Sequence, residues 1–160
     1  MEHNIKLTES VIPTQILEFF KSNNVLTLAT CDKEPWVCTL YYGADDQLNI
    51  YLVTDPNSIH GQMIKINSIV AFNIFDSRTA ITEPKVGIQG KGACTQVKDI
   101  TEVAKGLLLW HKFNPGVEKN ITTEDIKKWK DTKVYKIQPS YIKHFNKPLY
   151  GKEGYLICKL

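Results

Sequence analysis

The segment from Thr54 to Met63, TDPNSIHGQM, combines residue types that could bind an anion. It lies between a strand-like run and an amphipathic run. The pattern predicts Asp55 as a helix N-cap and Pro56 as the first helical residue, because proline lacks only a donor that has no partner there. Ser58 and His60 would then stand in the first turn, where free amides, a hydroxyl and a titratable imidazole converge. The spacing indicates a site for a phosphorylated cofactor.

The same segment also fits an ordinary helix start without a ligand. The side chain of Asp55 could itself cap the free amides of the first turn. Its negative charge would also oppose a bound phosphate. The residues of this segment alone leave both interpretations open.

The composition is that of a globular protein with little net charge. The 160 residues, 42% apolar and 23% charged, predict one domain over residues 1–160. A formal charge of +3 is only weakly basic, and we expect no nucleic-acid partner. Arg78 is the only arginine, so we expect no arginine clamp on a phosphate group.

The cysteines and the N-terminus favour a reduced, cytoplasmic protein. Cys31, Cys38, Cys94 and Cys158 are scattered and show no zinc-site spacing, so we expect buried, reduced thiols and no metal. The N-terminal residues have no apolar signal core. No run approaches the length needed to span a membrane, and we expect no membrane association.

Hydrophobic periodicity predicts the order of helices and strands. The three glycines of residues 85–97 indicate a bulge, a bend or a close backbone approach. Many strands at turn-limited spacing favour a closed or half-closed β-barrel with peripheral helices. The expected helices are 13–21, 57–66, 100–110 and 123–130, and the expected strands are 25–30, 36–42, 48–54, 68–75, 85–97, 133–145 and 154–160, the first three forming an antiparallel meander.

With this order established, a resemblance to a known family becomes visible. The runs VLTLATCDKEPWVCTLYY, LNIYLVTDPNSIHGQM, NSIVAFNIF, VGIQGKGACTQV and VYKIQPSYIKHF resemble, in this order, the FMN-binding split barrel of the pyridoxamine 5'-phosphate oxidase-like family. The similarity covers most of residues 14–145 and is greatest to small bacterial members. It implies a mainly β (α+β) fold, an antiparallel split β-barrel with peripheral helices, and a homodimer with FMN at the subunit interface.

The resemblance also assigns roles to individual residues. Side chains of the second strand would contact the flavin ring or ribityl chain, and the helix start after the third strand would contact the phosphate. A glycine-rich strand would reach the ring from the other subunit. The cofactor-binding residues implied in this way are Trp36, Val37, Cys38 and Thr39 for the flavin, Thr54, Ser58 and His60 for the phosphate, and Gln89 and Lys91 from the partner.

Two departures from the family pattern carry consequences. Family members usually have lysine or arginine at the position of His60, and a neutral imidazole donates one hydrogen bond without a fixed charge. FMN affinity is therefore expected to be weak or pH-dependent. The C-terminal NKPLYGKEGYLICKL lacks the arginine/histidine pair of true pyridoxamine phosphate oxidases, so oxidation of pyridoxamine phosphate is not expected.

The sequence leaves three classes of function. The first is an FMN-dependent oxidoreductase acting on an unknown small substrate or electron donor, whose chemistry would be the flavin's, so catalytic residues stay unknown. The second is a non-catalytic flavin, haem or tetrapyrrole binder on the same barrel. The third is a nucleic-acid-binding barrel with Trp36, Tyr41 and Tyr51 as a stacking face, which the small net charge disfavours.

Other polar residues favour structural roles. Asp45 and Asp46 lie in a predicted hairpin turn, where we expect the two carboxylates to be exposed to solvent rather than to act as an acid and a base. His111 lies near the end of a predicted helix, and this position indicates a role in packing or in capping the helix C-terminus. His144 could line a pocket. GIQGKG lacks the pattern of a phosphate loop.

Overall fold

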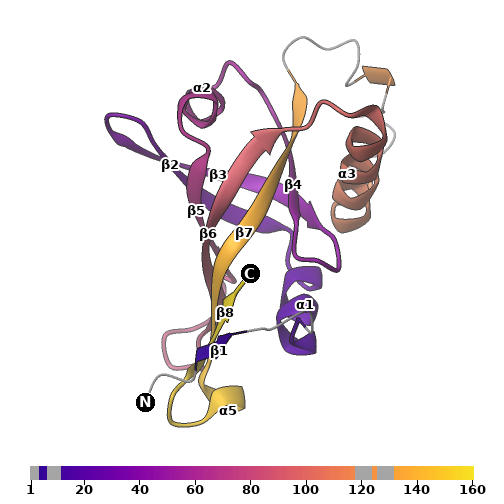
Figure 1. Cartoon of the computed structure of the whole chain (residues 1–160). Coiled ribbons are helices and arrows are strands. Elements are labelled where there is room, and N and C mark those ends of the chain that lie inside the picture. Colours follow the sequence, from indigo (N-terminus) through magenta and orange to yellow (C-terminus); the bar gives the residue numbers. More distant parts are fainter. Residues whose placement is uncertain (1–3, 7–11, 118–123, 126–131) are drawn as a thin grey trace.

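The computed structural model, shown in Figure 1, describes residues 4–6, 12–117, 124–125 and 132–160. The described strands form one sheet in the order β1-β8-β7-β4-β3-β2-β5-β6, and β6 also pairs with β7. The strands are β1 (Asn4–Lys6), β2 (Val25–Cys31), β3 (Pro35–Ala44), β4 (Ile50–Thr54), β5 (Ile69–Phe75), β6 (Val86–Gln96), β7 (Lys133–Asn146) and β8 (Tyr155–Lys159). The helices are α1 (Thr14–Lys21), α2 (Ile59–Ile66), α3 (Ile100–Phe113) and α5 (Lys147–Tyr150).

The long strand β7 closes the barrel. It pairs with β4 over its first residues, with β8 over its last ones, and with β6 along most of its length. The strands β2 to β7 thereby form an antiparallel barrel, with β8 and β1 added outside it. The β6–β7 register shifts between Lys91 and Gly92, and a Cβ at Gly92 would collide with the carbonyl of Gln138. The expected antiparallel barrel is confirmed, and so are a bulge and a close approach in the glycine-rich strand.

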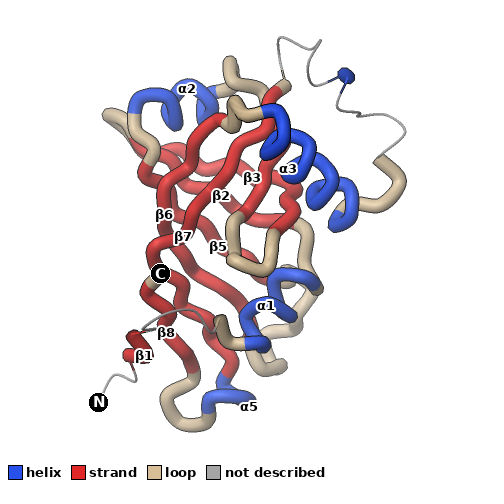
Figure 2. The backbone as a smooth tube through the Cα atoms, turned by 45° about the vertical axis from the view of Figure 1, so that its right-hand side comes forward, coloured by secondary structure: helices blue, strands red, loops and turns tan. Residues whose placement is uncertain are grey.

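Two helices cover the ends of the barrel. Ile16 and Phe20 of α1 are buried in the barrel core, together with inward side chains of the strands. Ile64 of α2 belongs to the same core. Figures 1 and 2 place α2 and α1 toward opposite ends of the sheet. Because helical spacing brings Ile16 and Phe20 onto one face, a short helix can bury both.

The third helix covers the outside of β3, β4 and β7. Val103, Leu107 and Trp110 of α3 bury Tyr51 and Val134 in a second apolar cluster. Polar contacts fix the helix there: the Tyr51 hydroxyl lies 2.6 Å from a Glu102 carboxylate oxygen. Lys105 and Lys136 form ion pairs with Asp45 and Glu102. One part of the outer barrel surface is therefore covered by α3 (Figure 2).

We expect Gly43→Ala to be strongly destabilising, because Gly43 stands where α3 comes closest to β3. A Cβ there would lie 2.5 Å from the backbone carbon of Leu109. Backbone cannot yield as a side-chain end can, so the free energy of unfolding should fall by about 3 kcal/mol, the upper end of typical overpacking costs. Urea denaturation measures this, with Lys33→Ala, a change of an exposed residue in the β2–β3 turn, as the control. Equal midpoints for Gly43→Ala and wild type would contradict the packing.

The structure corrects several sequence expectations. The strand expected from Leu48 begins at Ile50, because Leu48 has φ 63° in the preceding turn. The strand β1 and the short helix α5 were not predicted. The helix expected at 123–130 falls almost wholly outside the described residues. Cys94 and Cys158 are buried as expected, Cys38 is half-buried, and Cys31 is exposed at the end of its strand, contrary to expectation. Within the described residues, no helix is both long and apolar enough to cross a membrane.

Candidate functional site

The first half of β3 has a free edge. β3 pairs with β2 along Pro35–Tyr41, but with β4 only over Tyr42–Ala44. The second edge of Pro35–Tyr41 therefore has no strand partner within the described chain, and it presents backbone donors and acceptors for another molecule. Beyond Thr54 the chain turns into α2, which packs against β2 and β3. The free edge and α2 thus border the same end of the barrel.

Strand alternation divides the four residues predicted to contact the flavin. Trp36 and Cys38 pair with Thr30 and Leu28, whose side chains point inward and are buried. Val37 and Thr39 point to the outer face, and Val37 is 58% exposed. One flat ring can contact only one of these two sets through side chains. The other set could contribute only through the backbone of the free edge.

The structure brings Thr54, Ser58 and His60 together, as the sequence predicted. The His60 Nε2 atom lies 2.7 Å from Thr54 Oγ1 and 3.0 Å from Ser58 Oγ. Ser58 Oγ donates its single hydrogen to the Asp55 carbonyl at 2.6 Å and accepts from the Gly61 amide. Because that hydrogen is used, Ser58 can only accept from the ring, so we assign the proton to Nε2. The neutral ring then offers only an acceptor at Nδ1.

Burial keeps the His60 ring neutral. His60 is 9% exposed, and desolvation lowers its pKa below the ordinary 6.5, while the Asp55 carboxylate opposes this in part. At pH 7 the side chain therefore brings no positive charge to the helix start. A dianionic ligand would have to draw a proton onto Nδ1 to gain an ion pair.

The helix begins three residues later than predicted. Ser58, not Asp55, is the N-cap of α2, and Pro56 lies before the helix. The physical reason is a tight turn in which Asp55 Oδ1 accepts from the Asn57 amide at 2.7 Å, so this carboxylate is used before the helix starts. His60 does lie in the first turn, whose leading amides have no intrahelical acceptor. Of the donors expected at the helix start, the amides of Ile59 and His60 stay without a described acceptor, whereas the Ser58 hydroxyl and the Gly61 amide are engaged in the cap.

Gln89 and Lys91 lie on the outer face of β6. Both are exposed, and their strand neighbours on β5 are Asn73 and Ala71. Lys91 Nζ lies 5.9 Å from the centroid of the Tyr141 ring. Within one chain, no described hydrogen bond joins them to the cluster around His60. Any joint role with that cluster would require a second subunit, as the resemblance implies.

Sequence reasoning did not identify an uncharged patch on the outer barrel, which we call the open sheet face. Its side chains belong to alternate positions of β2, β3 and β5, and α3 does not cover it. Val37 and Tyr41 are each 58% exposed, and Ile69 is 60% exposed. Outward-facing positions of a strand on a solvated face normally carry polar or charged residues. The lack of charged residues at these positions in the sequence could therefore have indicated the patch. The face consists of Val25, Thr27, Ala29, Val37, Thr39, Tyr41, Ile69, Ala71 and Asn73.

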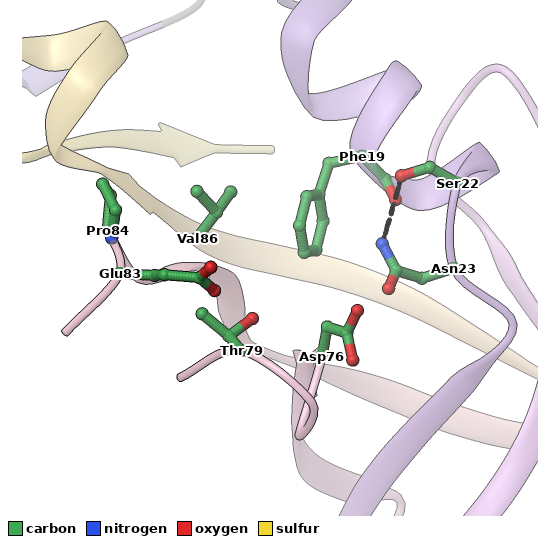
Figure 3. Close-up of a pocket in the computed structure, with 8 residues that line it drawn as sticks. All are labelled: Phe19, Ser22, Asn23, Asp76, Thr79, Glu83, Pro84 and Val86. Carbon is green, nitrogen blue, oxygen red and sulfur yellow. Dashed lines mark hydrogen bonds between the residues drawn. The ribbon is translucent and has the colours of Figure 1, made fainter. Parts of the chain in front are cut away.

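A separate cavity, drawn in Figure 3, lies between the end of α1 and the loop after β5. Its volume is about 530 Å³, and Phe19 and Val86 form its apolar part. The carboxylates of Asp76 and Glu83 also line it. Asp76 accepts two hydrogen bonds of 2.9 Å from Arg78, so the single arginine is already engaged. Two carboxylates make this cavity unsuited to a phosphate.

The remaining polar candidates have structural roles. Asp45 accepts from the amides of Gln47 and Asn49 and so holds the β3–β4 turn. Asp46 is exposed and pairs with Lys21. The described residues contain no cluster of histidine, cysteine or acidic side chains suited to a metal ion. These contacts explain the residues without invoking chemistry.

His144 should make stability depend on pH. Its ring is buried between Phe19 and Tyr150; Nδ1 lies 2.8 Å from the Tyr150 hydroxyl, and Nε2 is buried without a partner. Burial lowers the pKa of His144 below 6.5, so the unfolded chain binds the proton more tightly. This contribution is complete above about pH 6.5 and is lost as pH falls toward the folded-state pKa.

Melting temperatures measured from pH 8 to pH 5 test this expectation. The wild-type melting temperature should fall on acidification, and His144→Phe should show a smaller fall because it cannot titrate. His60, also buried and neutral, accounts for part of the remaining slope. Identical pH profiles for wild type and His144→Phe would remove His144 as a cause.

Comparisons with known proteins point to one fold. No family model matches the chain. A UPF0306 protein of Yersinia enterocolitica is 31% identical over 90 residues, which cover 55% of this chain and 60% of that protein. The match therefore spans less than two thirds of the relative's length.

Solved structures match over more of the chain. A heme binding protein from Mycobacterium smegmatis matches with a TM-score of 0.71 and 17% identity, over 94% of this chain and 60% of that one. A candidate pyridoxamine 5'-phosphate oxidase from Listeria innocua matches with a TM-score of 0.64 and 16% identity, over 82% and 95% of the two chains. At these identities the likeness concerns the fold. Together with the barrel closed by β7, it shows that this chain has the split-barrel fold of the pyridoxamine 5'-phosphate oxidase-like proteins.

Proposed function

We propose that this protein binds FMN as a homodimer and acts as a flavin-dependent oxidoreductase on a small substrate. The observation that carries the proposal is the position of the open sheet face. It adjoins the free edge of β3, while α2, with His60, borders the same end of the barrel. A second copy on the open sheet face would convert this exposed corner into an enclosed interface site.

The open sheet face supports a dimer by its chemistry. It contains no charged side chain, and its largest members, Tyr41 and Ile69, remain more than half exposed in the single chain. A contiguous exposed apolar patch of this kind marks an interaction surface. A two-fold contact would pair the patch with the same patch of the second subunit, so each residue in it would contribute buried surface area from both subunits. Gln89 and Lys91 on neighbouring β6 could then reach a cofactor held mainly by the other chain.

The start of α2 supports binding of the phosphate end. The amides of Ile59 and His60 have no described acceptor, and the hydroxyl groups of Thr54 and Ser58 and the imidazole of His60 lie at the same helix start. The free edge of β3 offers backbone groups that could pair with the flavin's ring edge, and Trp36 could cover part of the ring. FMN would supply the electron transfer, and the chain would bind, orient and shield it from water.

Haem is the alternative cofactor, because the structural neighbour from Mycobacterium smegmatis is named as a heme binding protein. The described histidines favour flavin instead. The Nε2 atom of His60 is engaged by Thr54 and Ser58, and the Nε2 atoms of His111 and His144 are buried. An axial iron ligand from these atoms would require rearrangement. The net charge of +3 adds no support for a nucleic-acid surface.

An absorbance spectrum of the purified protein, before and after addition of FMN, tests the cofactor. We expect flavin bands, either at once or after FMN addition and removal of excess cofactor by gel filtration. A Soret band without retained flavin would overturn the FMN proposal in favour of haem. Turnover of bound flavin by cell-extract fractions would then separate an enzyme from a carrier, since a carrier would show no substrate-dependent oxidation or reduction.

A further inference from the structure

A second cavity lies along α2, lined by residues other than those of the proposed cofactor site. Its volume is about 960 Å³, near the upper end of the range for small-molecule sites. Side chains of α2, the start of β5, the end of β6 and Tyr135 of β7 line it. Trp36, Thr54, Ser58 and His60 are absent from its lining. The cavity therefore adjoins the proposed cofactor site through α2 without sharing its key side chains.

The charge of this cavity has a single sign. Lys65 and Lys98 are the ionised side chains that line it, and no carboxylate does. Neither lysine makes an ion pair or hydrogen bond within the described part of the chain. Lys105 and Lys136 are engaged by Asp45 and Glu102 outside this cavity, whereas the ammonium groups of Lys65 and Lys98 are available for a ligand. Two unpaired ammonium groups at one cavity favour an anionic ligand.

The cavity also contains a hydroxyl donor that has no hydrogen-bond partner among the described residues. Tyr135 is 3% exposed and lines the cavity, and its hydroxyl makes no hydrogen bond within the described residues. Burial, and to a lesser extent the nearby Asp55 carboxylate, raises the pKa of this phenol, so the hydroxyl stays protonated and can donate a hydrogen bond. A hydroxyl that lines the cavity and has no protein acceptor can donate to a ligand oxygen.

The other residues that line the cavity indicate which apolar and polar groups a ligand would carry. Pro56, Ile64 and Ile66 give the cavity an apolar side. Amides and hydroxyls, including Gln62 and Thr95, form its polar border. A ligand that satisfies both would combine one anionic group with an apolar body.

We propose that this cavity binds a small organic acid. The acid group lies toward Lys65 and Lys98, a ligand oxygen accepts from the Tyr135 hydroxyl, and the apolar body lies against Ile64. The site goes beyond the proposed FMN function, because it uses different side chains and a different ligand. It could serve a substrate or an effector.

Naphthoate and its neutral analogue naphthamide provide matched probes, because the two molecules have nearly the same shape and differ in charge. Isothermal titration of the full chain should show saturable binding of naphthoate and at least tenfold weaker binding of naphthamide, the ratio for one charge-assisted contact. Lys65→Gln/Lys98→Gln should weaken naphthoate binding by tenfold or more, and Tyr135→Phe by severalfold. Lys152→Gln, which alters an exposed lysine in the turn before β8, is the matched control and should bind as wild type does.

Several results would overturn the proposal. They are equal affinity for the two probes, no saturable naphthoate binding in the millimolar range, or unchanged binding by the double lysine variant. Displacement of naphthoate by FMN would assign the cavity to the cofactor site instead. Because Lys65 and Lys98 are exposed and Tyr135→Phe keeps the ring, unchanged melting temperatures should verify that each variant is folded.

Discussion

Replacing Ile69 with glutamate should convert the proposed homodimer into a monomer of 18.3 kDa. Ile69 is 60% exposed on the open sheet face and is not among the residues expected to contact FMN. A two-fold interface would bury two new carboxylates without partners, each costing a few kcal/mol. The dimer dissociation constant should therefore rise by at least about 100-fold. Sedimentation velocity at micromolar concentration measures the change.

The matched control is Leu108→Glu. Leu108 is 70% exposed on α3, which covers a different part of the barrel, so this charge should leave the dimer intact. FMN affinity should fall with Ile69→Glu and not with Leu108→Glu, because the proposed cofactor site is built from both subunits. A wild-type protein that sediments as a monomer, or an Ile69→Glu protein that stays dimeric, would exclude the open sheet face as the interface.

Replacing His60 with alanine should weaken FMN binding by roughly 10- to 100-fold, the equivalent of one hydrogen bond to a charged group. His60→Lys should preserve or strengthen binding, because it places a fixed positive charge beside the phosphate. Ile66→Leu, a conservative change of a side chain that is 68% exposed in the last turn of α2, serves as the control for changes to the helix. Fluorescence quenching of FMN gives the three dissociation constants. Equal values for wild type, His60→Ala and His60→Lys would remove His60 from the site.

The pH dependence of FMN binding follows from the His60 pKa. Burial lowers this pKa in the free protein, and a phosphate dianion would raise it in the complex. Affinity should be weak and constant above the bound-state pKa, increase as pH falls through it, and level off below the free-state pKa. Loss of the second phosphate charge below about pH 6 should flatten the gain further. His60→Ala should show a smaller slope, and a flat wild-type profile would contradict the ion pair.

The protonation geometry explains why this slope should be steep. Nε2–H is already used between Thr54 and Ser58, so neutral His60 has no second donor. Protonation adds an N–H at Nδ1 and a positive charge at the same time. Uptake of one proton therefore gives FMN binding both an additional hydrogen-bond donor and an ion pair with the phosphate.

Much of the fold could be read from the sequence because its signals are local. Alternation in residues 25–30 and 68–75 specified strands with one buried face, and the spacing of Ile16 and Phe20 specified a short helix. The glycines of β6 indicated the bulge near Gly92. The order of these elements, with the family resemblance, was enough to predict the barrel.

The start of α2 shows where local reading failed. Both Asp55 and Ser58 are good N-cap residues, and the sequence cannot say which one the backbone uses. The turn closed by Asp55 with the Asn57 amide decides it in favour of Ser58. The short strand β1 was equally unreadable, because its three residues gain their pairing only from distant β8.

The sequence by itself determined most of the elements, the barrel class and the grouping of Thr54, Ser58 and His60, because these depend on short-range spacing. Only the tertiary structure decided that the His60 ring is buried and neutral, that Val37 and Thr39 face outward, and that the open sheet face has no cover. The cavity bordered by Lys65, Lys98 and Tyr135 likewise exists only after folding, since these residues lie on α2, after β6 and on β7. Burial, pairing edges and pKa values depend on which distant segments pack together, and no local pattern encodes that packing.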